Sequence, residues 1–456
     1  MKRTFLKMIT MKRTLCSLTL SSAMMTAMAG GYLGNTNQSI GFLRNPARDA
    51  SFGIDGVYYN PAGTAFLRDG LHLELNWQMV HQHRDSRANY GGLFRYNFAN
   101  PATAADGSRE YGGRVNVPFQ PSLFALYNHN DWSYMLGFGF IGGGGDCEYG
   151  SGMGMFEALV GSKALAALGS DFGGYSADIY VRGRSYDLGL TLGVARKVNE
   201  RLSLSFGLRG IGVMNNYKGH LRDIRFRTKG GMIIDKSMNP ALADLELDCD
   251  QSALGIAPII GIDYKVSQQL NIAAKYEFRT RLTTKNSAAN SESFNQLAAS
   301  QPSLGGYLDG VKAPTDMPAL LTVGVQYSPI QSLRLSAGYH RYFDVDTRQW
   351  NKSRLGDTNE LTLGAEYDIT PRLEVSAGGQ RTIYDQTDAN VSDMSFNLSS
   401  YSVGAGISYR ISPKVKVNAA YFTTIYNDYT KTVPQQSVTT YSRTNQVIGV
   451  GMELEL

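Results

Sequence analysis

Hydrophobic and polar positions alternate along many segments of this chain, each of about ten residues. In the first segment, Leu71 to Met79, leucine, tryptophan and methionine take every second position and polar residues lie between them. Successive side chains of a β-strand point to opposite faces, so this pattern predicts strands with one apolar and one polar face. It recurs often enough to predict fourteen strands, at residues 71–79, 117–127, 132–140, 186–194, 202–208, 254–264, 270–280, 319–327, 333–341, 361–369, 373–383, 401–410, 415–423 and 446–456.

The links between these strands alternate in length, as an up-and-down barrel requires. Short links lie at 128–131, 198–201, 266–269, 328–332, 370–372 and 412–414, and long ones near 81–116, 141–184, 212–253, 281–317, 342–359, 384–400 and 424–445. Together with the even strand count, this alternation predicts an all-β fold, a closed antiparallel transmembrane β-barrel whose long links face away from the cell.

A soluble β-sandwich also hides one face of each strand, so it is the alternative to a membrane barrel. Two features favour the barrel. The apolar face carries aromatic residues near the strand ends, as interface girdles do, and the other face carries mid-strand charges, which a dry core tolerates only when they are paired. The aromatic residues are Trp77, Trp132, Tyr264, Tyr327, Tyr339, Tyr367, Tyr409 and Tyr421; the charged residues are Glu74, Asp187, Lys275, Glu277, Glu366 and Glu374.

Composition agrees with a lipid-facing β-protein. The 456 residues include 50 glycines, 27 tyrosines and 19 phenylalanines, and 18% are charged, whereas a helical enzyme would contain more Ala, Glu and Leu. No linker divides the chain, and no run of about 20 apolar residues follows the N-terminal region, so the sequence predicts no membrane-spanning helix.

Residues 1–29 have the pattern of a secretory signal peptide. Basic residues come first, an apolar stretch runs from Leu15 to Met25, and Ala27-Met28-Ala29 forms the cleavage box, so the mature chain is expected to begin at Gly30. Met-Lys-Arg-Thr occurs at both Met1 and Met11, and translation could start at either. Such export and the barrel pattern together predict location in the outer membrane of a Gram-negative bacterium.

The net charge of the mature chain is about zero. Five of the 44 Lys and Arg residues belong to the signal, and the remaining 39 face 39 Asp and Glu residues. A nucleic-acid partner therefore has no electrostatic support. Cys16 leaves with the signal, while Cys147 and Cys249 remain; they could form a disulfide between two long outer loops or stay free and buried.

Residues 30–70 precede the first strand and contain no good strand pattern. A barrel of fourteen strands encloses a lumen that its own side chains cannot fill, so the lumen is either plugged or conducts water. We expect residues 30–70 to form a hatch inside the barrel of residues 71–456.

The tripeptide Asn-Pro-Ala occurs twice in this hatch segment. Proline fixes its own φ and moves the preceding asparagine away from helix, and an asparagine amide can bond backbone groups at a turn. Alanine and glycine keep the bulk low where the segment passes the wall. The tripeptide is therefore either a plain turn or a brace that holds the hatch against the wall, and it lies at Asn45, Pro46 and Ala47 and at Asn60, Pro61 and Ala62, the latter followed by Gly63.

The stretch DGVYYNPAGTAF, the two Asn-Pro-Ala tripeptides, the fourteen strands and the N-terminal segment together resemble the FadL-type outer-membrane transporters of long-chain fatty acids and aromatic hydrocarbons. The resemblance implies a monomer with a hatch, hydrophobic pockets near the outer mouth, and a gap in the wall that releases the ligand sideways into the membrane. The implied partners are a long-chain fatty acid or other hydrophobic small molecule, outer-membrane lipid and lipopolysaccharide, and the barrel-assembly machinery. The chain departs from the usual barrel pattern at its end, because Leu456 stands where an aromatic residue is common.

A change of period within the link at 141–184 predicts a helix over residues 153–169. Its apolar stripe either packs on neighbouring loops as a cap or serves as a capture surface for an amphipathic ligand, and the two roles are compatible. The stripe consists of Met155, Phe156, Leu159, Val160, Ala164 and Leu168.

Four consecutive glycines at 142–145 lack the following helix and lysine of a phosphate-binding loop, so they predict a flexible exit from the third strand. The resemblance places the lateral gap at a distortion of that strand, which Gly137 and Gly139 would permit. Pro258 in the sixth strand is a second candidate for a kink or bulge.

Charged residues gather at the outer end of the first strand and in the third long link. His81 and His83, with Asp85 beyond, could resemble a metal-binding pair, but no third ligand is identifiable, so a polar barrel rim explains them better. The same residues suggest an outer-membrane protease or phospholipase as the enzyme alternative, but no paired catalytic arrangement supports it. We predict no cofactor and no catalytic residue. Arg84, Arg87, Arg222, Arg225, Arg227 and Lys229 form either a surface that faces solvent or lipopolysaccharide, or a site for a fatty-acid carboxylate.

The sequence thus predicts a monomeric, hatch-plugged barrel for passive uptake of long-chain fatty acids or other hydrophobic compounds, with no enzyme activity. The alternative is a general or small-solute porin, whose lumen would stay open and polar.

Overall fold

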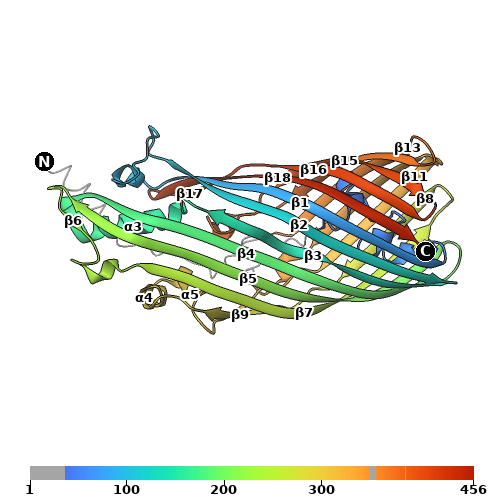
Figure 1. The fold of residues 1–456 in the computed structure, drawn as a ribbon, viewed down its shortest axis with the longest axis horizontal. Helices are drawn as coiled ribbons and strands as arrows, with labels where there is room; N and C mark the ends of the chain where they lie inside the picture. Colours follow the sequence, from blue (N-terminus) through green and yellow to red (C-terminus); the bar gives the residue numbers. More distant parts are fainter. Residues whose placement is uncertain (1–35, 350–355, 386) are drawn as a thin grey trace.

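The computed structural model describes residues 36–349, 356–385 and 387–456, which form a closed antiparallel barrel around a short helical segment (Figure 1). The predicted signal peptide and the first residues of the predicted hatch lie outside these ranges. Long loops gather at one end of the barrel, and the short turns and the C-terminus lie at the other (Figure 1). In barrels of this kind the short turns face the periplasm.

Fourteen strand positions make up the wall, as the alternation predicted. β18 pairs with β1 from His72↔Glu455 to Asn89↔Val438, which closes the barrel. The wall strands are β1 (Gly70–Asn89), β2 (Arg109–His129), β3 (Trp132–Tyr149), β4 (Phe172–Lys197), β5 (Leu202–Thr228), β7 (Leu245–Lys265), β8 (Leu270–Glu277) continued by β9 (Thr283–Ala288), β11 (Leu320–Ile330) preceded by β10 (Lys312–Pro314), β12 (Leu333–Tyr342), β13 (Thr358–Asp368), β14 (Leu373–Ile383), β15 (Ser400–Ser412), β16 (Val415–Tyr426) and β18 (Ser437–Glu455).

Several strands run far beyond their predicted outer ends, and parts of the predicted long links are therefore strand. β4 and β5 have 26 and 27 residues and pair along almost their whole length. Their outward positions become polar near the loops, for example at Asp178, Arg182 and Lys218. The alternation of hydrophobicity ends there while the ladder continues, which is why the sequence pattern missed these tips.

Helices occur in the lumen and in the outer loops. The lumenal ones are α2 (Ile40–Arg44) and the 3₁₀ turns η1 (Ile54–Val57) and η2 (Ala62–Phe66). The loops contain η3 (Leu93–Tyr96), α3 (Gly154–Leu168), η4 (Gly169–Asp171), η5 (Pro240–Leu242), α4 (Glu292–Ser300), α5 (Pro302–Gly305), η6 (Asp344–Asp346) and η7 (Asp388–Asn390), with the short strands β6 (Ile233–Ile234) and β17 (Tyr429–Val433). Within the described ranges, no helix is long and apolar enough to span a membrane.

The two faces of the wall differ as predicted. Outward side chains such as Trp77, Leu192 and Leu363 are 43%, 55% and 67% exposed, which suits contact with lipid. The mid-strand charges Glu74 and Lys275 are buried in the lumen. This face assignment agrees with the membrane barrel and not with a sandwich.

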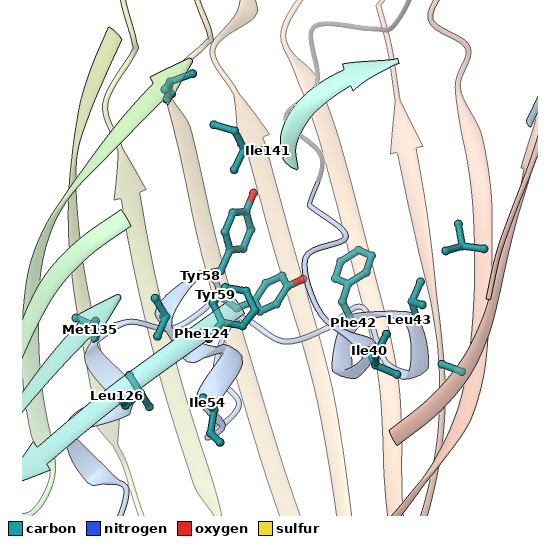
Figure 2. Packing of buried hydrophobic residues seen from close by; sticks show 14 of the residues in the cluster. Ile40, Phe42, Leu43, Ile54, Tyr58, Tyr59, Phe124, Leu126, Met135 and Ile141 are labelled. Atoms are coloured by element: carbon teal, nitrogen blue, oxygen red, sulfur yellow. The ribbon is translucent and has the colours of Figure 1, made fainter. Parts of the chain in front are cut away.

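The main apolar cluster lies inside the barrel, where the hatch segment meets β2 and β3 (Figure 2). Phe42 of α2 stacks on Tyr59 with ring centroids 5.7 Å apart, and Phe124 and Met135 of the wall belong to the same cluster. The side chain of Ser39 accepts the Phe42 N–H and so begins α2. Apolar contact thus holds this segment across the lumen as a plug.

Candidate functional site

Both Asn-Pro-Ala turns use the asparagine amide in the same way. The Asn60 side-chain oxygen accepts the Gly63 N–H at 3.1 Å, and its nitrogen donates to Asp263 Oδ2 on β7 at 2.6 Å. The Asn45 oxygen accepts the Ala47 N–H at 3.0 Å, and its nitrogen faces Glu366 Oε1 on β13 at 3.5 Å. Each amide therefore caps its own turn and reaches a carboxylate of the wall.

The small residues at these turns allow a close approach to the wall. The Ala62 carbonyl accepts the Ser203 hydroxyl of β5 at 2.7 Å. A Cβ at Gly63 would lie 2.3 Å from Asn60 Nδ2, and a Cβ at Gly364 of β13 would lie 1.8 Å from Asn45 Oδ1. Larger side chains at either glycine would push the amides from their positions.

The tyrosine pair before the second tripeptide joins this part of the hatch to residues 36–38 and to the wall. Tyr59 Oη accepts the Gln38 N–H at 2.9 Å and donates to the Thr36 carbonyl at 2.7 Å. The Tyr58 ring lies against Arg209 and Lys275 of the wall, whose cationic groups are both 4.7 Å from its centroid. Burial raises the pKa of the Tyr59 phenol, so this group stays protonated and able to donate.

Ion pairs join the hatch to the far wall. Arg44 Nη1 lies 2.6 Å from Glu374, and Arg48 lies 2.8 Å from both Asp55 of the hatch and Glu366 of the wall. Burial alone would lower the pKa of the Arg48 guanidinium, but Asp55 and Glu366 raise it well above its usual value. Arg48 therefore stays charged inside the lumen.

A buried histidine makes a third connection. His340 of β12 lies between Asp49 of the hatch, at 2.9 Å from Nε2, and Glu360 of β13, at 2.9 Å from Nδ1. The mid-strand charges were predicted to face the lumen, but their hatch partners were not predicted. Arg48 and Asp49 directly follow the first Asn-Pro-Ala tripeptide, and a basic and an acidic residue there are the signal that sequence reasoning could have used.

The wall is interrupted between β2 and β3. The ladder pairs Val115 with Cys147 and next pairs Leu123 with Phe138, so the β2–β3 ladder is not formed between residues 116–122 and 139–146. In this region β3 is irregular, and Gly143 and Gly145 adopt positive φ values of 94° and 71°, which favour glycine. The glycine run thus lies within the third strand as its distorted part.

Two glycines were predicted to permit the distortion of the third strand. Gly139 borders this break, and Gly137 lies just below it, paired with Phe124. Gln38 of the hatch occupies the edge of the break. Its side chain donates to the Phe140 carbonyl at 2.7 Å, and its carbonyl accepts the Ser122 hydroxyl. A Cβ at Gly139 would lie 2.3 Å from Gln38 Oε1, so the glycine leaves room for this contact.

Pro258 lies at a second interruption, between β7 and the β8–β9 position. β7 pairs with β9 up to Ser252↔Lys285 and with β8 from Ile259↔Glu277. Between these registers the Pro258 carbonyl accepts the Phe278 N–H at 3.0 Å. The proline is therefore at a break in the ladder, but not at the one beside the hatch terminus.

A cavity of about 220 Å³ lies in the lumen and reaches the β2–β3 break. Residues of the break line one side, including Phe140 and Gly142–Gly145, and Tyr384, Tyr426 and Arg443 line the other. Phe42 of the hatch also lines it. The cavity thus connects the hatch, the break and the opposite wall.

The predicted helix exists as α3, but its stripe does not form one surface. Phe156 and Leu159 line an apolar cavity of about 40 Å³ together with residues of β4, β5, β7, α4 and α5. Val160 is buried in a second apolar cluster, formed with β4 and β5, and Leu168 packs against that cluster. Met155 packs against a third cluster, which contains Cys147 and Tyr149. Glu157 was missed: it is buried in the first turn of the helix and binds Arg109, Tyr111, Tyr175 and Asn97.

The two cysteines are free in the structure, so the disulfide considered from the sequence is absent. Cys147 lies in β3 and Cys249 in β7, in different apolar clusters. Neither lies in a loop as expected, because β3 and β7 extend further than the alternation predicted. Both thiols are buried as small apolar groups.

The rim residues divide between the faces of β1. His81, His83, Asp85 and Arg87 alternate on the outer face, whereas Arg84 is buried inside. In the third long link, Arg222 pairs with Glu246. Across the described part of the chain, no group of three or more His, Cys, Asp or Glu residues could hold a metal ion.

Solved structures show the same architecture. A FadL homologue from Pseudomonas aeruginosa aligns with a TM-score of 0.63 at 14% identity, over 92% of this chain and 98% of that one. The chain has the FadL-type fold. The toluene transporters TodX from Pseudomonas putida and TbuX from Ralstonia pickettii align with TM-scores of 0.56 and 0.55, at 17% and 16% identity, each over 89% of this chain and over 94% and 95% of theirs.

The comparisons confirm the FadL-type resemblance as a resemblance of fold. The predicted location in an outer membrane agrees with this fold. No family model matches the sequence, and no curated protein matches it. The sequence signal was therefore architectural: strand count, the N-terminal segment and two tripeptides.

Proposed function

We propose that this chain is a monomeric outer-membrane channel for passive uptake of long-chain fatty acids or other hydrophobic compounds. One observation carries the proposal: the lumenal cavity is bounded by the hatch and reaches an interruption of the wall between β2 and β3. An open channel across the membrane needs no such interruption. The structural neighbours TbuX and TodX are toluene transporters, which supports a hydrophobic ligand.

The proposed path begins at the outer apolar cavity beside α3. Phe156, Leu159, Phe294 and Leu297 line it, and side chains of this kind bind apolar ligands without strict specificity. Its volume of about 40 Å³ is small, so a ligand must displace side chains to enter. Capture there would be followed by movement into the lumenal cavity.

Exit follows through the β2–β3 break. Gln38 bridges the edge of the break through Phe140 and Ser122, so its displacement would open the way from the cavity to the membrane. The two Asn-Pro-Ala turns brace the hatch while Gln38 moves. There is no nucleotide motif in the sequence, and transport would run down the ligand gradient.

A blocking label tests the exit. In a background with Cys147→Ala and Cys249→Ala, Gln120→Cys places a thiol in the part of β2 that does not pair with β3 and lines the cavity. A bulky maleimide there should abolish uptake of labelled oleate, with the degree of labelling measured by mass spectrometry. The matched control is Gln446→Cys on the outer face of β18. Normal uptake by fully labelled Gln120→Cys protein would exclude this exit.

The porin alternative draws on the polar side of the cavity, which includes Gln82, Glu360 and Gln380. Conductance in planar bilayers separates the two functions. A hatch-plugged transporter should show little steady current, whereas large steady openings of the unmodified protein would favour the porin.

A further inference from the structure

Two arginines face each other inside the seam that closes the barrel. Arg84 of β1 and Arg443 of β18 are direct partners in the ladder. Arg84 is 1% exposed, and Arg443 lines the lumenal cavity. Like charges directly opposite each other destabilise a strand pair, so this position has a cost in the empty protein.

No carboxylate offsets these charges in the described part of the chain. Neither guanidinium takes part in an ion pair there, and Arg84 Nε, Arg84 Nη1 and Arg443 Nε are buried without a hydrogen-bond partner. Among the described residues, the polar contact of the Arg84 side chain is a long one, from Nη2 to the Phe396 carbonyl at 3.4 Å. Buried charged donors without acceptors are costly, which indicates that an acceptor is supplied from elsewhere.

The rest of the lumen shows that this chain can supply such acceptors. Arg44, Arg48, Arg209, Arg334 and Lys416 each pair with at least one carboxylate at 2.9 Å or less. Arg84 and Arg443 differ from these five residues because neither has a carboxylate partner in the described part of the chain.

Acidic residues near the seam pair already have partners. Asp393, on the loop that carries Phe396, accepts the Tyr441 hydroxyl and the Met155 N–H, both at 2.8 Å. Glu360, which lines the same cavity as Arg443, accepts His340 and three further side chains. Neither carboxylate is bonded to the arginines.

Aromatic rings hold both guanidinium groups. The Arg84 Cζ lies 4.7 Å from the Phe396 ring centroid, and the Arg443 Cζ lies 4.8 Å from that of Tyr426. A guanidinium stacked on a ring keeps its in-plane N–H groups available, and this geometry suits a bidentate carboxylate.

We infer that Arg84 and Arg443 bind the carboxylate headgroup of an amphipathic ligand. The inference rests on the proposed function and narrows its substrate class to anionic amphiphiles. The apolar tail would lie in the lumenal cavity, where Phe42, Phe422 and Val447 also contribute to the lining. Neutral hydrocarbons would gain nothing from the arginine pair.

Binding to the purified full chain in lipid nanodiscs tests the inference with three probes: dodecanoate, dodecanol and acetate. Charged hydrogen bonds of this kind correspond to roughly a tenfold or larger change in affinity. Arg84→Gln and Arg443→Gln should therefore weaken dodecanoate binding by about 10- to 100-fold and leave dodecanol binding unchanged. Arg443→Lys keeps the positive charge and should therefore bind dodecanoate more tightly than Arg443→Gln does. Arg87→Gln, on the outer face of the same strand, is the matched control.

A stability measurement guards against misfolding. Since each substitution removes one of two facing charges, the empty variants should unfold at a temperature equal to or above that of the unmodified protein. A structural role for the pair would lower this temperature instead.

Two results would overturn the inference. Equal dodecanoate affinity in the control and both seam variants would show that the arginines do not bind the headgroup. Acetate binding as tight as dodecanoate binding would indicate a small-anion site without a tail. Uptake assays in cells separate the headgroup site from the proposed function. If cells take up neutral toluene and the variants bind dodecanoate as tightly as the unmodified protein, only the headgroup site is refuted. If cells take up no hydrophobic compound, the transport proposal is refuted.

Discussion

The lumen contains two layers of arginines that differ in their partners. In the hatch layer, Arg48 lies between Asp55 and Glu366, and each guanidinium is matched by carboxylates. Nearer the outer mouth, Arg84 and Arg443 face each other without one in the described ranges. A buried pair is very sensitive to loss of one partner, whereas an unmatched pair is ready to accept an added one. The first arrangement suits a plug that must stay in place, and the second suits a site that a ligand fills.

Removing a charge from the hatch layer should have the largest effect. Arg48→Met leaves Asp55 and Glu366 buried without their shared cation, and breaking such a pair costs about 3–5 kcal/mol. We expect a lower free energy of unfolding from lipid vesicles in urea and steady leak current in planar bilayers.

Arg87→Met is the control for this substitution, because Arg87 and Asp106 form an exposed pair on the outer side, each 54% exposed. Exposed pairs contribute about 0–1 kcal/mol, so neither stability nor current should change much. Equal effects of the two substitutions would mean that the hatch does not depend on its buried ion pair.

The sequence could predict on which face of the wall each strand charge lies. Strict alternation placed Glu366 and Lys275 in the lumen, because a period of two assigns faces without knowledge of neighbours. The partners could not be predicted, since Arg48 and Glu366 are 318 positions apart and meet only after barrel closure. Arg84 was assigned to the basic outer rim together with Arg87, although the same alternation separates these two residues onto opposite faces of β1.

Helix α3 shows the same limit in another form. Its period of 3.6 predicted the helix over 153–169, and the structure has it at Gly154–Leu168. The role of each apolar residue depends on which loop it meets, and no local pattern contains that information. Phe156 therefore lines a cavity while Val160 is buried in a core.

The Asn-Pro-Ala brace should show an intermediate effect. Asn60→Ala with Pro61→Ala removes the amide that caps Gly63 and reaches Asp263, and loss of a buried hydrogen-bond partner costs about 1–3 kcal/mol. Because Asn271 still donates to Asp263, we expect a folded barrel with slower oleate uptake or a small leak. Normal heat-modifiable gel mobility verifies folding. Unchanged uptake and conductance would mean that the tripeptide is only a turn.

The smallest effect is expected from a substitution that gives Arg84 and Arg443 a carboxylate partner, like those in the hatch layer. Gln82 lies two positions from Arg84 on the inner face of β1, and it pairs with Asn445, two positions from Arg443. Its Oε1 atom is buried without a hydrogen-bond partner. Gln82→Glu changes the shape of the side chain little and adds a carboxylate within reach of both arginines, since diagonal neighbours in a ladder contact through long side chains.

This internal carboxylate should compete with the ligand. Charged hydrogen bonds contribute about 1.5–3 kcal/mol, and partial satisfaction of the arginines should lower dodecanoate affinity by about tenfold. Dodecanol affinity should stay the same, and the empty protein should unfold at a higher temperature. Gln120→Glu, on β2 in the same cavity, is the matched control, because its ladder partner on β1 is Gln78 and not a neighbour of Arg84. If both substitutions weakened dodecanoate equally, the general negative charge of the cavity, and not the satisfaction of Arg84 and Arg443, would explain the loss.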